Sequence, residues 1–262
     1  PLLKKYSGKN VFKIKELSDN QVSEILSQHN LKNVSGLTKE LKSLLKIPLH
    51  LDIFIEIYST ELQISQFNSI QDLYNELWNK KLINPSNFDN GLQKEKVIEL
   101  VYSLAERMFE NQEINSITIP FQDKYTNELR YIESTSLVKC NNRFIEFFHQ
   151  SFLEYVVARK FVFDQTNITQ DIKKKHQGLF LRSKIQQILN YKRNVDPDSY
   201  IQDLKDLVKD HEIRYHIKAL ALQLVAFQES PSNREVSFVK GVFGKYVDIK
   251  ELFISYYHGV GW

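Results

Sequence analysis

The chain has 262 residues and a formal net charge of +3, and 42% of its residues are hydrophobic while 26% are charged. These proportions are typical of globular proteins and exclude a disordered or collagen-like chain. The charge is too small to indicate nucleic-acid binding by itself, and the single cysteine, Cys140, excludes an internal disulfide framework. No apolar run is long enough to span a bilayer, so we expect a cytoplasmic protein without a membrane partner.

The N-terminal part of the sequence predicts a strand and two helices. Residues 11–17, VFKIKEL, alternate apolar and charged side chains as a short strand does. Ser18 and Gln21 form the pattern of a capping box, which predicts a helix that begins directly after Ser18. A second helix is expected to carry Leu41 and Leu45 on its apolar face.

A proline divides the next stretch, LLKIPLHLDIFIEIY, residues 44–58. Pro48 lacks an N–H and restricts the residue before it, so it ends one helix or opens the next. The apolar residues from Leu49 to Tyr58 crowd more than one face, which predicts a central helix. Another helix, over residues 70–82, precedes a turn-rich loop at residues 84–91 that we interpret as a domain boundary.

The middle of the chain predicts a winged-helix unit over residues 86–163. Apolar residues at helical spacing indicate an amphipathic helix over residues 93–110. A shorter helix over residues 127–132 and a hairpin around Asn141 and Asn142 follow. Helices, a hairpin and then a helix that begins near His149 are the order expected of a winged helix.

The remaining residues predict further helices. The segments IQQILNYKR, YIQDLKDLVKD and IRYHIKALALQLVAF each carry an apolar stripe, as stacked helical hairpins do. Residues 248–262 are assigned as one more helix with aromatic packing. The expected fold is therefore mostly α: a helical domain, a winged-helix domain with a small β-hairpin, and an α-solenoid-like helical region.

The sequence shows no catalytic machinery and no metal site. It has no GxxxxGK[ST] phosphate loop, no GxGxxG and no strand that ends in paired carboxylates. The segment HEIRYH, residues 211–216, is not interpreted as a zinc site because its histidines are one residue too far apart to share a helix face; we assign both to a helix surface or to packing. Lysine clusters are interpreted as solvated helix faces rather than phosphate contacts; they lie at Lys4 and Lys5, at Lys173 to Lys175, and at Lys192 with Arg193.

The stretch RFIEFFHQSFLEYVVA, residues 143–158, places His149 between the pair Phe147–Phe148 and Phe152, where a strand becomes a helix. We expect a buried imidazole, which must find a hydrogen-bond partner. Phe148, Phe152, Tyr155 and Val156 share one face and should pack inward. The first turn of such a helix favours an anion, to which His149 could donate a hydrogen bond. The alternative is that His149 caps a neighbouring carbonyl in the core of the winged helix.

The run FIEFFHQSFLEYVVARKFV resembles the F-x-H-x-x-F-x-E-Y-x-x-A signature of the winged-helix region in NACHT-type NTPases, which are members of the STAND class of signalling ATPases. The matching positions are Phe147, His149, Phe152, Glu154, Tyr155 and Ala158. The segment LLKIPLHLDIFIEIY is similar to the helical domain of the same family, and VFKIKELSDNQVSEIL to the stretch after the last core strand of its nucleotide-binding fold.

This resemblance implies a division of the chain and two nucleotide contacts. Residues 1–30 would be the end of the nucleotide-binding domain and a connector, 31–85 the helical domain, 86–163 the winged-helix domain and 164–262 a C-terminal helical domain or the start of a helical-repeat sensor. His149 would contact the β-phosphate of ADP, and Pro48 would line the base pocket. Glu154 and Tyr155 are assigned to packing. Because the phosphate loop and the magnesium carboxylate are missing, we expect them to precede Pro1 in a longer protein that binds ADP or ATP with Mg.

By this resemblance the chain is the regulatory half of a signalling ATPase and, by itself, not an enzyme. The winged helix would sense ADP or ATP and control opening and homo-oligomerisation. Its partners would be the upstream nucleotide-binding domain and a trigger ligand at the C-terminal helices, and bacterial defence signalling is a family association. Two alternatives are a helical interaction scaffold and a winged-helix DNA-binding regulator. The charged residues of FQDKYTNELRYIES are of both signs and not predominantly basic, so a nucleic-acid partner is not expected.

Overall fold

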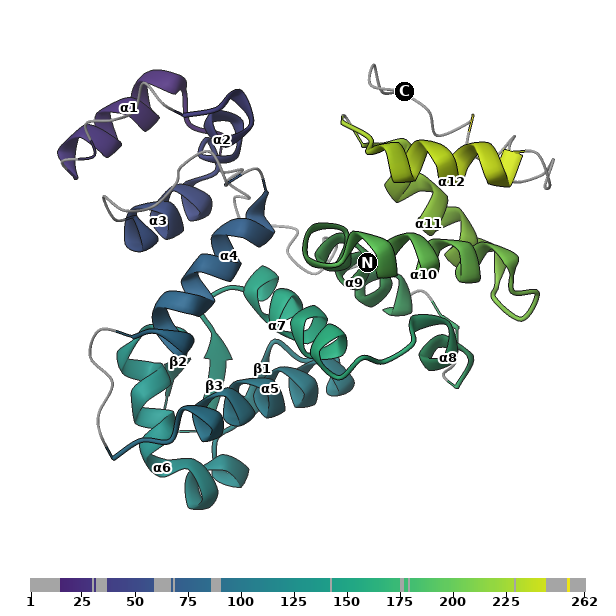
Figure 1. The fold of residues 1–262 in the computed structure, drawn as a ribbon. Helices are drawn as coiled ribbons and strands as arrows, with labels where there is room; N and C mark the ends of the chain where they lie inside the picture. The colour runs from purple at the N-terminus through teal and green to yellow at the C-terminus, as the bar shows by residue number, and fades with distance from the viewer. Residues whose placement is uncertain are drawn as a thin grey trace, which may run out of the picture. The chain divides into compact units, whose positions relative to one another are not determined.

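The structure, a computed structural model, describes residues 15–29, 31, 37–58, 67, 69–85, 91–141, 143–174, 177–178, 180–228, 230–243 and 254. The chain divides into two compact units, Pro1–Asn87 and Phe88–Trp262, and each is described by itself. Across the described ranges helices predominate, and the β structure there is one small three-stranded antiparallel sheet (Figure 1). The expected mostly α fold is thus confirmed. None of the helices in those ranges has the length and apolar character that crossing a membrane requires.

In the first unit, helix α1 (Asp19–Gln28) begins as the capping box predicts. The Ser18 side chain accepts a hydrogen bond from the Gln21 N–H at 3.3 Å, and the Gln21 side chain accepts one from the Ser18 N–H at 2.9 Å. Two otherwise unpaired N–H groups at the helix start are thereby satisfied. Of the strand expected over residues 11–17, residues 11–14 lie outside the described ranges, and residues 15–17 form no strand.

Three more helical elements complete the described part of this unit. They are α2 (Lys39–Leu44), α3 (Pro48–Ile57) and α4 (Ile70–Trp78), the last continued by a π-helical turn over Asn79–Ile83. Helix α3 packs against α4, and Lys80 and Lys81 in the π-helical turn both bind Glu56 of α3. Buried leucine, isoleucine and aromatic side chains of α2, α3 and α4 form the core, which includes Leu41, Phe54, Ile57, Leu73 and Leu77.

The second unit begins with the element order of a winged helix. The elements are α5 (Lys94–Asn111), β1 (Asn115–Ile117), α6 (Ile119–Ser134), β2 (Val138–Cys140), β3 (Phe144–Phe147) and α7 (Gln150–Phe163). Helix α6 is bent at Tyr125, whose φ of −133° and ψ of 37° are not helical, so it consists of two helical segments. Sequence analysis predicted only residues 127–132 of α6 and did not predict β1.

The sheet has the order β1–β3–β2, and all pairs are antiparallel. The predicted hairpin between β2 and β3 is confirmed. The side-chain oxygen of Asn141 accepts hydrogen bonds from the N–H groups of Arg143 at 3.1 Å and Phe144 at 2.8 Å, which closes the turn. Asn142, also expected in this turn, lies outside the described residues. Strand β3 contacts α7, so the centre of the sheet leads directly into the helix that follows His149.

Five further helices follow, and several pack against one another as the apolar stripes predicted. They are α8 (Ile168–Lys173), α9 (Phe180–Val195), α10 (Pro197–Lys209), α11 (Tyr215–Ala226) and α12 (Asn233–Phe243). Helix α10 contacts α8, α9, α11 and α12 and therefore lies at the centre of this group. Of the helix expected over residues 248–262, only Ile254 lies within the described ranges.

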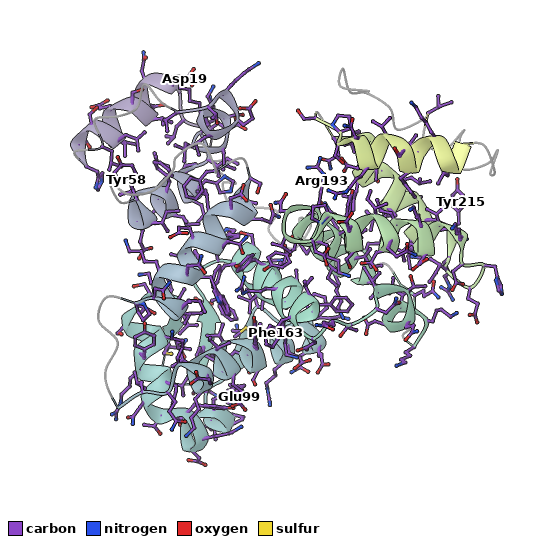
Figure 2. The ribbon with its side chains drawn as sticks, in the orientation of Figure 1. Asp19, Tyr58, Glu99, Phe163, Arg193 and Tyr215 are labelled. Atoms are coloured by element: carbon purple, nitrogen blue, oxygen red, sulfur yellow. The ribbon has the colours of Figure 1, made fainter. Side chains whose placement is uncertain are left out.

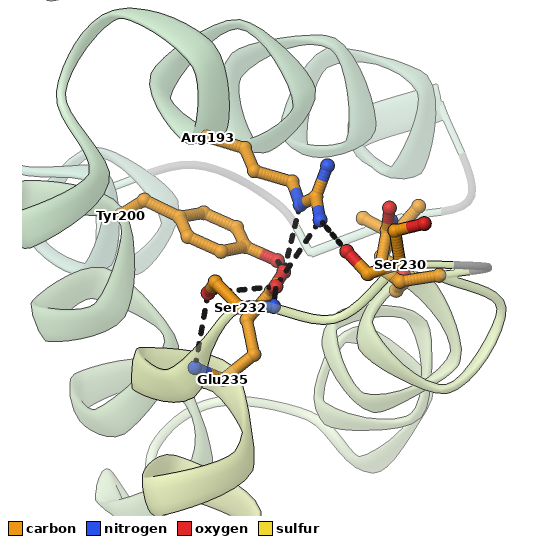
Figure 3. Close-up of polar contacts among 7 residues, drawn as sticks. Arg193, Tyr200, Ser230, Ser232 and Glu235 are labelled. Carbon is orange, nitrogen blue, oxygen red and sulfur yellow. Dashed lines mark hydrogen bonds and ion pairs between the residues drawn. The ribbon is translucent and has the colours of Figure 1, made fainter. Parts of the chain in front are cut away.

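Two basic residues of α9 form ion pairs, and of these Lys192 is buried and Arg193 is partly exposed. The Lys192 ammonium lies 2.5 Å from a carboxylate oxygen of Asp203, and each side chain is 7% exposed. Arg193 donates to both oxygens of Glu235 at 2.7 and 3.1 Å (Figure 3). The expectation of solvated charge at these two positions is wrong, because the acidic partners come from α10 and α12 and the spacing within α9 does not reveal them.

The cluster Lys173 to Lys175 was also expected on a solvated helix face, and its described residues agree better with that expectation. Lys173 is one-third exposed and pairs with Asp210 and Glu212, and Lys174 is exposed. Lys4, Lys5 and Lys175 lie outside the described residues.

Candidate functional site

His149 lies between the end of β3 and the first turn of α7, where it is the N-cap residue of the helix. Its backbone is extended, with φ −153° and ψ 146°, and its side chain is exposed. The imidazole Nδ1 accepts a hydrogen bond from the Ser151 N–H at 3.1 Å, and the Ser151 hydroxyl oxygen lies 2.6 Å from the same nitrogen. The histidine therefore does what a serine or aspartate commonly does at a helix start.

This geometry corrects two expectations from the sequence. The imidazole is exposed rather than buried, and it accepts a hydrogen bond from an N–H instead of donating one to a neighbouring carbonyl. A neutral imidazole that accepts at Nδ1 carries its proton on Nε2. The Nε2–H of His149 has no acceptor among the described residues, so it is available to a ligand from outside the chain.

We expect nuclear magnetic resonance to detect this tautomer. Long-range correlation spectra of the neutral imidazole should place the proton of His149 on Nε2, because the backbone N–H of Ser151 occupies Nδ1. His211, which is exposed in the turn before α11, is the internal reference. A predominantly Nδ1-protonated His149 would show that the capping hydrogen bond does not form in solution.

The start of α7 is held by a group of aromatic rings. The Phe152 ring lies 5.9 Å from Phe147, 4.9 Å from Phe148 and 5.6 Å from Tyr155, measured between ring centroids. Phe152 is fully buried, and Phe147 and Tyr155 are nearly so. The Phe148 N–H also donates to the Leu137 carbonyl at 3.1 Å. These contacts fix the first turn of α7 and thus the position of His149.

Helix α7 is also connected to α9 by side chains that sequence analysis did not single out. The carboxylate of Glu154 accepts hydrogen bonds from the amides of Gln150 at 3.1 Å and Gln187 at 2.8 Å. Glu154 is thus more than a packing residue, because it links α7 to α9. Its partner in α9 is 33 residues away in the sequence, so no local pattern could have identified the pair.

A second connection lies one turn further along α7. The Arg159 guanidinium donates to the hydroxyls of Tyr155 at 3.3 Å and Tyr191 at 2.8 Å. Burial raises the pKa of both tyrosines above the ordinary value of 10, so both stay protonated over the physiological range. These two polar connections, together with the contact between the Tyr155 and Tyr191 rings at 5.5 Å between centroids, attach the His149 helix to α9.

Pro48 is the first residue of α3 and is exposed. The N–H of the first residue of a helix has no acceptor within the helix. A proline at this position therefore removes no hydrogen bond. The preceding Ile47 is 39% exposed, so the two side chains form a small apolar surface at the helix start. The His50 Nδ1 lies 3.0 Å from the Leu44 carbonyl oxygen, which connects this turn to α2. Pro48 and His149 belong to different units, and each is described within its own.

Few hydrogen-bond donors remain at the start of α7. The Ser151 N–H is occupied by the imidazole, so the anion-binding capacity expected of the whole first turn is smaller than the sequence suggested. The His149 Nε2–H and the Gln150 N–H remain as donors at this end. Among the described residues there is no group of His, Cys, Asp and Glu side chains that could hold a metal ion.

The HEIRYH segment is confirmed not to share one helix face. His216 belongs to α11, whereas His211 lies in the turn before it, so the assignment of His211 to a helix surface was wrong. Glu212 precedes α11 as well and pairs with Lys173.

No protein-family model matches the sequence, and comparison with curated proteins likewise gives no match.

Proposed function

We propose that this chain is the regulatory part of a NACHT-type STAND NTPase, in which the winged helix responds to bound ADP or ATP. One observation carries the proposal. His149 stands exposed at the start of a firmly anchored helix, its Nδ1 is occupied, and its Nε2–H points to no acceptor among the described residues.

The winged-helix order of α5 to α7 and the roles of the motif residues support this proposal. Phe147, Phe152 and Tyr155 bury their rings around the first turn of α7, and Glu154 connects that helix to α9. Each position of the F-x-H-x-x-F-x-E-Y pattern therefore has a physical reason for its residue type. The exposed Ile47 and Pro48 offer an apolar surface of the kind against which a base could lie.

In this proposal the chain contributes binding and positioning rather than chemistry. ADP supplies the phosphate, and His149 donates one hydrogen bond from Nε2 to it. A hydrogen bond to a charged group is worth about 1.5 to 3 kcal/mol, which shifts a two-state equilibrium by about ten- to a hundredfold. Loss of that bond would release the winged helix and, with it, the C-terminal helices that α7 contacts through α9.

The test uses a protein that contains this chain together with an upstream nucleotide-binding domain. His149→Ala is expected to reduce the ADP retained after gel filtration by about tenfold or more and to increase the oligomeric fraction. His211→Ala, which removes an exposed histidine from a turn of the same unit, should change neither. Equal ADP content and equal oligomer distribution in the two variants would refute the proposed role.

The winged-helix order also favours a second candidate, a DNA-binding regulator. In such proteins a basic helix faces outward. The charges of α6 are mixed, and its Lys124 is engaged with Glu99 of α5 at 2.9 Å. This composition argues against phosphate binding along α6. A salt-dependent shift of duplex DNA by the purified chain would favour this candidate over the first.

A further inference from the structure

A groove lies between α5, α7 and α9, beside the first turn of α7. Its volume is about 590 Å³, and it is lined by the end of α5, the segment that leads to β1, and the first turns of α7 and α9. This volume is within the range of about 300 to 1,000 Å³ in which protein ligand sites fall. The proposed nucleotide contacts of His149 and Pro48 lie outside its lining, and Gln150 is part of it.

Apolar side chains form the floor of the groove and part of its mouth. Met108, Leu153 and Leu181 line it and are buried. Ile114 also lines it and is 60% exposed. A single exposed isoleucine is ordinary on a protein surface, but here it extends the apolar floor outward to where an occupant would enter.

The rim near Ile114 is held by the end of α5. Gln112 has a left-handed backbone, with φ 57° and ψ 38°, and the Glu113 N–H donates to the Met108 carbonyl at 2.9 Å. This helix ending fixes the direction in which the chain leaves α5. The opposite wall is fixed by the hydrogen bond between Glu154 of α7 and Gln187 of α9. The groove is therefore formed in the free chain.

The charges around the groove are acidic. Glu110 and Glu113 line it, are exposed, and have no partner among the described residues. Glu154 accepts only from the neutral amides of Gln150 and Gln187, so no basic side chain is paired with its carboxylate. The lysine that lines the groove, Lys184, is paired with Asp171 at 2.9 Å. An acidic rim on a chain whose net charge is +3 attracts cations and repels phosphate-rich surfaces.

We propose that this groove docks a short segment of a partner protein that presents apolar side chains beside lysine or arginine. The apolar side chains would cover the floor and Ile114, and the cationic groups would face Glu110 and Glu113. Such an occupant would touch Gln150, the first residue of α7, and so lie next to the helix start that carries His149. The docking surface does not depend on the proposed nucleotide contact, since it consists of other side chains.

Three labelled peptides of about four helical turns test the proposal by fluorescence anisotropy with the full chain. One has a leucine face and a lysine face, the second replaces leucine with alanine, and the third replaces lysine with glutamate. The leucine–lysine peptide is expected to bind at least about tenfold more tightly than either of the others. Equal binding of the alanine–lysine peptide would show attraction by charge alone and would overturn the proposal.

Groove variants with matched controls locate the binding. Ile114→Ser should weaken binding of the leucine–lysine peptide by about fivefold, whereas Ile119→Ser, at an isoleucine that is 65% exposed on α6, should not. Glu110→Lys with Glu113→Lys should weaken the leucine–lysine peptide about tenfold and strengthen the leucine–glutamate peptide.

The variant Glu95→Lys with Asp123→Lys controls for the change in net charge, because both residues are exposed and lie outside the groove lining. Equal effects of the groove and control variants would contradict this location. Groove variants that change the association state of the chain without changing peptide binding would identify a second copy as the occupant and would also contradict the proposal.

Discussion

Replacement of Glu235 with alanine is expected to lower the free energy of unfolding by about 3 to 5 kcal/mol. The Glu235 side chain is fully buried, and its oxygens accept from Arg193, from the Ser232 N–H at 2.7 Å and from the Tyr200 hydroxyl at 3.3 Å (Figure 3). The substitution leaves the partly buried Arg193 guanidinium without its carboxylate partner and the buried Tyr200 hydroxyl without its acceptor, and it removes the acceptor of the Ser232 N–H at the start of α12. Urea denaturation followed by circular dichroism measures the loss.

The adjacent Arg234→Ala is the matched control. Arg234 pairs with Asp198 at 2.9 Å, but these side chains are 55% and 78% exposed, so the cost should stay below about 1 kcal/mol. Similar decreases in the free energy of unfolding of the two variants would mean that the buried carboxylate of Glu235 contributes no more to stability than a surface ion pair.

The contribution of Glu235 should also depend on pH in a defined direction. Burial opposes its charge, but the hydrogen bonds from Arg193 and Ser232 outweigh burial and hold its pKa below the ordinary value of 4.5. A carboxyl with a lowered folded-state pKa stabilises the fold fully above its unfolded-state pKa and loses that contribution as the pH falls through the folded-state value. The stability difference between the natural chain and Glu235→Gln should therefore be constant above pH 4.5 and shrink below it. A difference that grows on acidification would contradict the assignment.

Phe152→Ala is expected to cost about 3 to 5 kcal/mol, because it removes a fully buried ring that contacts three other aromatic rings. The cavity would lie beneath the first turn of α7, so the amide protons of that turn should exchange faster with solvent. Hydrogen exchange and urea denaturation measure the two effects. The lower stability and the faster exchange have the same cause, the removal of the Phe152 ring.

Phe163→Ala on the same helix provides the comparison. Phe163 is 74% exposed at the end of α7 (Figure 2), so its loss should cost less than about 1 kcal/mol and should leave exchange at the first turn unchanged. If the two variants were equally stable, the aromatic group around Phe152 could not be what anchors the helix.

The sequence revealed the features that depend on local spacing. Ser18 and Gln21 predicted where α1 begins, because a capping box is a contact between residues three apart. Asn141 and Asn142 predicted the hairpin because asparagine tolerates the positive φ of a tight turn. The hairpin forms, but Asn141 does not have a positive φ and contributes through its side chain, which bonds to the backbone of the next residues. Strand β1 is only three residues long, which is too short for an alternating pattern to stand out.

Long-range partners and unusual caps were not predictable. Lys192 looked like a surface lysine because nothing near it in the sequence marks Asp203 as its partner. Glu154 looked like a packing residue because its amide partner Gln187 belongs to α9. His149 was expected to be buried because phenylalanines surround it in the sequence. The extended backbone at the helix start turns it outward, while its neighbours pack inward.

The most direct test of the proposed function is a crystal structure of a protein that joins this chain to its nucleotide-binding domain, grown with ADP. We expect the His149 Nε2 to lie about 2.7 to 3.2 Å from an oxygen of the β-phosphate, with Nδ1 still accepting from the Ser151 N–H. A nucleotide bound with the imidazole directed to solvent, or paired at Nε2 with a protein group, would contradict it.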